Sequence, residues 1–88
     1  MRKYMIERDL PGVGAMSGED LHGAATTSNG ALAKLAPRVQ WQQSYVAGDK
    51  TFCVYLAEDE QAIRDHAELS GFPATKITPI ETVIDPTT

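Results

Sequence analysis

The sequence predicts one α+β domain, residues 1–88, with the element order β-α-β-β-α-β. Three observations lead to this prediction. An uncharged, strand-like run is followed directly by an amphipathic helix at residues 50–73. A second strand-like segment precedes that run across a short turn. A further strand and helix occupy the first 37 residues, and a last strand closes the chain.

The first strand is predicted at residues 3–9, where alternate side chains fall on opposite faces. Tyr4, Ile6 and Arg8 share one face, and Met5, Glu7 and Asp9 share the other. Residues 10–15, LPGVGA, read as a turn. They lack the Lys-Ser/Thr pair and the spacing of a phosphate-binding loop.

The first helix is predicted to begin at Ser17, with Asp20 completing a weak capping box, and to end at Pro37. Asn29 and Gly30 predict a kink or a turn in its middle. Its inward stripe falls at helical spacing and consists of Leu21, Ala24, Ala25, Ser28, Leu32 and Leu35.

The second strand is predicted at residues 38–47, with Val39, Trp41 and Tyr45 on one face. The turn at residues 48–50 returns the chain as an antiparallel hairpin. Residues 51–56, TFCVYL, form the third strand, whose lack of polar alternation indicates cover on both faces.

The second helix is predicted to begin after Asp59, a suitable N-cap, and to end at Gly71 before Pro73. Its inward face is expected to carry Ala62, Ile63, His66, Ala67, Leu69 and Ser70. The last strand is predicted at residues 76–84 and is placed at an edge or a bulge, because Pro79 cannot donate to a ladder.

This order is the ferredoxin-like plan, in which two helices cover one face of a four-stranded antiparallel sheet. The helices leave the other face open, yet TFCVYL is apolar on both sides. A second copy packed sheet to sheet covers that face, so the sequence predicts a homodimer of the dimeric α/β-barrel type.

Composition and charge argue against several classes of function. The formal net charge of −4 argues against a nucleic-acid partner. No segment is long and apolar enough to span a membrane, and residues 1–9 lack the apolar core of a signal peptide. A single cysteine excludes an internal disulfide and fits a reducing compartment, so a cytoplasmic protein is expected.

Three residues are candidates for chemistry. His66 lies on an inward helix face, where its ring needs a partner and has the donor atoms to bind a metal or act as a base. Cys53 lies in the middle of a strand, where a cysteine usually behaves as an inert small hydrophobe. Glu7 lies in the middle of the first strand. No third group orients a Cys53–His66 pair, so no catalytic residue is assigned.

Three segments resemble a known family: YMIERDLPG, FCVYLAEDEQAIRDHAELSGFP and TPIETVIDPT. It is a family of small bacterial domains of unknown function, common in actinobacteria and related to a nickel-binding, nickel-responsive protein. The resemblance implies a ferredoxin-like fold, a dimer and binding of nickel or another divalent metal. If a metal is bound, the residues that match positions often occupied in the family are Glu7, Cys53 and His66.

Three functional hypotheses follow. The first is a dimeric protein that binds nickel or a similar divalent ion. The second is a small-molecule-binding or regulatory dimer, with its pocket between helices and sheet or inside the dimer. The third is a dimeric α/β-barrel enzyme, a monooxygenase or isomerase, with a cavity lined by His66, Tyr55, Trp41 or Glu7. The resemblance ranks the first slightly ahead, and a binding protein is preferred to an enzyme.

Overall fold

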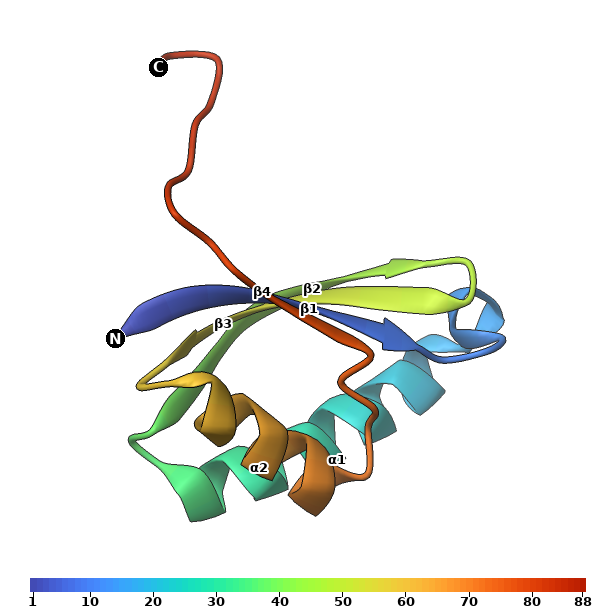
Figure 1. The fold of residues 1–88 in the computed structure, drawn as a ribbon. Helices are drawn as coiled ribbons and strands as arrows, with labels where there is room; N and C mark the ends of the chain where they lie inside the picture. The colour runs from blue at the N-terminus through green and yellow to red at the C-terminus, as the bar shows by residue number, and fades with distance from the viewer.

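A computed structural model describes all 88 residues and confirms the ferredoxin-like plan. The four strands form one antiparallel sheet in the order β2-β3-β1-β4, and both helices lie on the same face of it (Figure 1). In chain order the elements are β1 (Arg2–Asp9), the 3₁₀ turn η1 (Val13–Ala15), α1 (Gly18–Leu35), β2 (Val39–Ala47), β3 (Lys50–Ala57), α2 (Glu60–Ser70) and β4 (Lys76–Pro79).

Helix α1 begins as predicted, because the Ser17 hydroxyl accepts a hydrogen bond from the Asp20 backbone N–H at 3.1 Å. The predicted turn at Asn29 and Gly30 is wrong, since α1 continues through both residues. Packing of the helix on the sheet and on α2 outweighs the weak helix propensity of these two residues.

Helix α2 also has its predicted ends. The Asp59 carboxylate accepts from the Ala62 N–H at 2.9 Å, and Gly71 ends the helix at φ 78°, a conformation that glycine adopts without strain. Ala62, Ile63 and His66 are buried as predicted, whereas Leu69 is half exposed.

Strand β2 differs from its predicted pattern. A bulge between Trp41 and Gln43 shifts the alternation by one residue. Trp41 therefore pairs with the inward Tyr55, while Tyr45 pairs with Phe52 on the open face and is 55% exposed. The prediction that Trp41 and Tyr45 share a face is wrong because of this extra residue.

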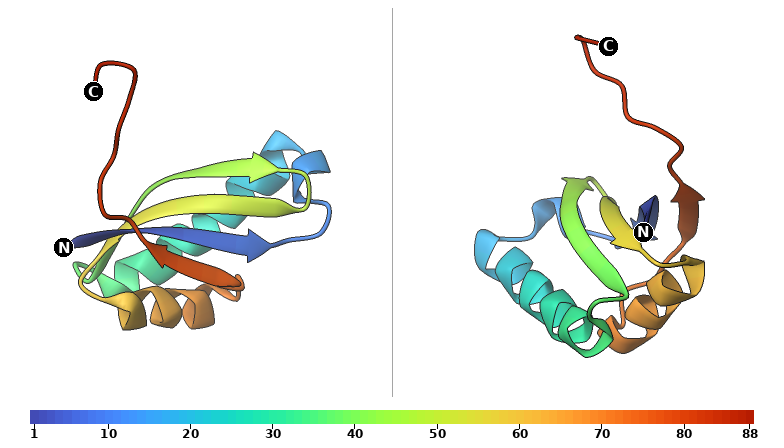
Figure 2. Two further views of the ribbon diagram at one scale, coloured as in Figure 1. Left: turned by 45° about the horizontal axis from the view of Figure 1, so that its top comes forward. Right: turned by 90° about the vertical axis from the view of Figure 1, so that its left-hand side faces the viewer.

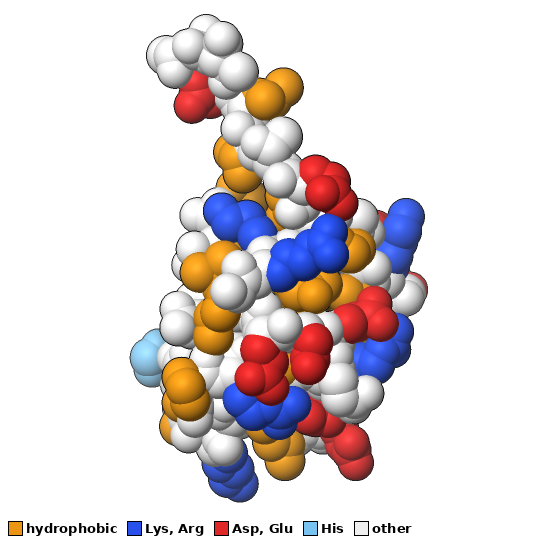
Figure 3. Space-filling view, turned by 60° about the vertical axis from the view of Figure 1, so that its left-hand side comes forward, with side chains coloured by type: hydrophobic (Ala, Val, Ile, Leu, Met, Phe, Trp, Pro, Cys, Tyr) orange, Lys and Arg blue, Asp and Glu red, His pale blue; other side chains and the backbone are white.

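Strand β4 ends at Pro79 and does not reach residue 84. One more backbone bond, from the Ile80 N–H to the Lys3 carbonyl, holds the chain to β1. Residues 80–88, the C-terminal arm, then leave the sheet on the side away from the helices (Figures 1 and 2). The arm stands clear of the body and carries hydrophobic side chains into solvent, namely Val83 and Ile84 (Figure 3).

The hydrophobic core lies between the helices and β1, β2 and β3. Its members are Tyr4, Ile6, Leu35, Val39, Cys53, Tyr55, Ala57, Ala62 and Ile63. From α1 this cluster takes only Leu35, at the C-terminal end of the helix, with Leu32 packed against it. Neither helix is long and apolar enough to cross a membrane.

Candidate binding pocket beneath helix α1

The N-terminal half of α1 does not fill the space between itself and the sheet. Four of its residues there line the space: Leu21, Ala24, Ala25 and Ser28. The last three are smaller than the Leu32 and Leu35 that pack the other half. A half-open pocket of about 220 Å³ results. The sheet side is formed by inward residues of three strands, and Leu10, Val13 and Leu21 also line the pocket.

Arg8 lies in the wall of this pocket although its neighbours on the inward face of β1 are apolar. It is only 2% exposed. Its Nη1 donates to the backbone carbonyls of Phe72 and Pro73 at 3.2 and 3.0 Å, in the connection between α2 and β4. No carboxylate forms an ion pair with it. A buried guanidinium normally has such a partner, because burial removes the hydration that stabilises its charge.

His66 of α2 lies beside this guanidinium. Its Nδ1 is 3.5 Å from Nη2 of Arg8, and its Nε2 is 3.1 Å from the Ser28 hydroxyl of α1. A guanidinium can only donate, so Nδ1 is the acceptor and the ring proton resides on Nε2. Burial first, and the Arg8 charge second, lower the pKa of His66 to about 4, while hydrogen bonding to the Ser28 backbone acts in the opposite direction. The imidazole is therefore neutral at pH 7.

Tyr55 completes the polar group at the pocket wall. Its ring centroid lies 5.3 Å from that of His66, and Cζ of Arg8 lies 5.8 Å from the Tyr55 centroid. Burial raises the pKa of Tyr55, and the nearby Arg8 charge partly offsets that rise. Ser28 and Arg8 are the hydrogen-bonding neighbours of its hydroxyl. We call Arg8, Ser28, Tyr55 and His66 the polar cluster; its members come from β1, α1, β3 and α2.

The three residues predicted to bind a metal do not gather at one point of the protomer. Cys53 and His66 lie on the helix side of the sheet, where both are buried. Glu7 lies on the open face, where its carboxylate is 3.8 Å from Nζ of Lys50. No group of three or more histidine, cysteine, aspartate or glutamate side chains in the chain is placed to hold an ion.

These residues also have other partners. The Cys53 thiol donates to the Thr51 hydroxyl at 3.5 Å, and both ring nitrogens of His66 are engaged. The cationic Arg8 beside His66 opposes a second cation there. Within one protomer the set Glu7, Cys53 and His66 thus does not fit a divalent metal, and metal binding itself stays a prediction.

Sequence reasoning found part of the polar cluster and missed its centre. Tyr55 and Trp41 of the enzyme hypothesis do line the pocket, while His66 and Glu7 are not among its lining residues. Arg8 was not a candidate, although its position on the face of Tyr4 and Ile6 was visible in the sequence. A charged residue on the apolar face of a strand is the signal that identifies such a site.

The comparisons with known proteins agree with this fold. A family model described as nickel responsive protein SCO4226-like matches residues 4–80 of the chain. The chain belongs to the SCO4226-like family. This match spans the sheet, both helices and the whole polar cluster.

A solved relative supports the same architecture for the SCO4226-like family. The crystal structure of SCO4226 from Streptomyces coelicolor A3(2) superposes with a TM-score of 0.74 and 19% sequence identity, covering 93% of this chain and 99% of that chain. At this identity the likeness establishes the fold. No curated protein matches the chain.

Proposed function

We propose that this protein binds a small organic molecule in the pocket beneath α1. One observation supports the proposal above others: an apolar cavity of about 220 Å³ is lined by three buried members of the polar cluster, Arg8, Ser28 and Tyr55, and the fourth, His66, contacts Arg8 and Ser28. Ligand sites commonly combine an apolar lining with a few polar groups that orient the ligand. A fold does not by itself determine a function, so the support for this proposal comes from the pocket.

The size of the pocket limits the ligand. An engineered apolar cavity of about 150 Å³ holds benzene. A half-open pocket of about 220 Å³ therefore suits one ring or a short alkyl chain with a polar group attached. A dinucleotide or a haem is far larger than this space.

A pair of variants tests the proposal. Ala25→Leu places three more carbons into the pocket, whereas Ala33→Leu makes the same change on the exposed side of α1. We expect single-ring and six-carbon probes to shift the NMR resonances of pocket residues in the wild type and in Ala33→Leu, and to lose that effect in Ala25→Leu. Probes that bind Ala25→Leu as well as wild type contradict the proposal.

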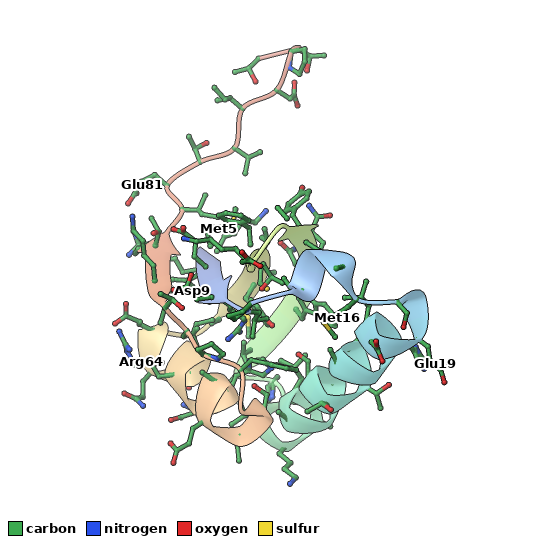
Figure 4. All side chains as sticks on the ribbon, turned by 90° about the vertical axis from the view of Figure 1, so that its right-hand side faces the viewer. Met5, Asp9, Met16, Glu19, Arg64 and Glu81 are labelled. Atoms are coloured by element: carbon green, nitrogen blue, oxygen red, sulfur yellow. The ribbon has the colours of Figure 1, made fainter.

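We also propose that the working form is a homodimer closed over the open face of the sheet. Met5 lies on this face, as seen in Figure 4, together with Phe52, Val54 and Leu56 of β3. The C-terminal arm leaves the sheet on the same side. Nine residues reach up to about 30 Å when extended, which is enough to cross a partner's sheet. We therefore propose that a second copy of the chain covers this face.

Nickel binding is the second candidate function, and family membership is the observation that favours it. Since no group of three or more candidate ligand side chains gathers within one protomer, we propose that bound nickel takes ligands from two protomers. Glu7 on the open face is placed for such sharing, whereas the buried His66 and Cys53 are not. A free, buried cysteine also agrees with the expected cytoplasmic location.

The metal hypothesis is tested on untagged protein by thermal melting with nickel, zinc, copper and a chelator. A saturable shift with nickel that is lost in Glu7→Gln but kept in Glu19→Gln, an exposed carboxylate of α1, supports a site on the open face. Equal melting temperatures under all these conditions exclude it.

A further inference from the structure

The pocket wall carries the positive charge of Arg8, and no carboxylate of the chain pairs with it. Arg8 is buried, and the carboxylates nearest to it in the sequence, Glu7 and Asp9, both pair with Lys50 at the sheet surface. Its partners inside the fold are two backbone carbonyls and a neutral imidazole, none of which bears a full negative charge.

The guanidinium also keeps donors for a further partner. It has five N–H groups, and three hydrogen bonds within the chain involve it. Its Nε makes none of these bonds. Because Arg8 lines the pocket, its guanidinium borders the space that a ligand would occupy.

The neighbours of Arg8 add further hydrogen-bond donors at the pocket. The Tyr55 hydroxyl lies beside Arg8 and Ser28, and a tyrosine hydroxyl can donate its own proton. With the ring proton of His66 on Nε2, the Ser28 hydroxyl accepts from the imidazole and retains its own proton to donate. The polar cluster thus presents donors and a positive charge.

We infer that the ligand of this pocket is an organic anion, a carboxylate on an apolar body of about one ring or six carbons. The carboxylate accepts from the free N–H groups of Arg8 and from Tyr55, and the apolar body contacts the small residues of α1 and Trp41. An arginine and a carboxylate match in geometry as well as charge, which makes this pairing stronger than one with a neutral amide. The inference rests on the proposed binding function and specifies the ligand class.

Matched pairs of probes test it: benzoate with benzamide, phenylacetate with phenylacetamide, and hexanoate with hexanamide. Each pair differs in charge while the apolar body is kept. We expect at least one acid to bind about tenfold or more tightly than its amide, measured by calorimetry and by NMR shifts of Arg8, Ser28 and Tyr55. Inorganic phosphate, an anion without an apolar body, is expected not to bind.

Variants of Arg8 test whether the charge of this side chain causes the preference for acids. Arg8→Gln is expected to remove the preference for the acid and leave amide binding unchanged, and Arg8→Lys to retain part of the preference. Arg64→Gln removes the same charge from the exposed side of α2 and serves as the control (Figure 4). The comparison of acids with amides uses the wild type, so it holds even if Arg8→Gln does not fold.

The outcomes distinguish the two proposals. Acids and amides that bind equally well leave the binding function standing and overturn the inference about charge. Six probes that all fail to bind overturn the binding function itself. Preference for the acid that survives in Arg8→Gln places the charge recognition elsewhere and also overturns the inference.

Discussion

At the scale of single residues, the neutral state of His66 has a measurable consequence. Its pKa is about 4 in the folded protein and 6.5 in the unfolded chain. Between these values the unfolded chain binds a proton that the folded protein does not. The free energy of unfolding therefore falls as the pH falls from 6.5 to 4, by about 3 kcal/mol in total, and this contribution is constant above pH 6.5.

We predict that His66→Gln removes this pH dependence. Glutamine has an acceptor for Arg8 and a donor for Ser28 but does not titrate. Urea unfolding from pH 7.5 to 4 measures the effect, with His22→Gln on the exposed side of α1 as the control. The wild type and His22→Gln should lose stability together, and His66→Gln should lose less. Parallel curves for all three proteins contradict this account of His66.

At the scale of elements, the connection between β1 and α1 packs directly on the β2–β3 hairpin. The Gly14 N–H donates to the Gly48 carbonyl at 2.7 Å, and the Leu10 N–H donates to the Asp49 carbonyl at 2.8 Å. The sequence predicted a simple turn here. In the structure this segment closes one end of the pocket through Leu10 and Val13.

We predict that Gly14→Ala destabilises the protein by about 1–3 kcal/mol, because its Cβ comes 2.7 Å from the Gly48 carbonyl oxygen, where only backbone can move. Gly23→Ala is the matched control. It lies inside α1, its Cβ meets open space, and it should raise stability by up to about 1 kcal/mol. Thermal melting of the two variants measures the difference. Equal and small effects contradict the close packing of the connection.

The elements also show how far the sequence predicts the structure. The caps of α1 and α2 were predictable because each depends on a residue next to the helix end: Ser17, Asp59 and Gly71. The bulge in β2 was not, because the pairing of Trp41 and Tyr45 depends on β3 across the sheet. The alternating pattern of β2 alone places both side chains on one face of the sheet. Only the pairing of β2 with β3 shows that they lie on opposite faces.

The candidate site was partly predictable for the same reason. An inward His66 followed from helical spacing alone. Its contact with Arg8 joins β1 to α2 over 58 positions of sequence, and no spacing rule gives such a contact. The predicted metal residues illustrate the limit: Glu7 and Cys53 were each placed correctly along their strands, yet they lie on opposite faces of the sheet.

At the scale of the whole molecule, two apolar surfaces lack cover within one protomer. One is the open face with the partly exposed Phe52 and Leu56 of β3. The other is the C-terminal arm, on which Val83 is 66% and Ile84 is 74% exposed. Both lie on the side of the sheet away from the helices (Figures 1 and 2). Burial of each aliphatic side chain against a partner contributes about 1.5–3 kcal/mol, which makes the arm a substantial part of the proposed interface.

We predict that the protein sediments at twice its 9.6 kDa chain mass and that Val83→Ser combined with Ile84→Ser weakens this association by at least about tenfold. Thr82→Ser combined with Thr87→Ser changes the same arm without altering its apolar residues and should leave the dimer intact. Sedimentation equilibrium over a range of concentrations measures the dissociation constants. Because neither pair touches the core, circular dichroism should show the same fold in all three proteins. A wild type that stays monomeric rules out the dimer, whereas a dimer insensitive to Val83 and Ile84 restricts the interface to the sheet face.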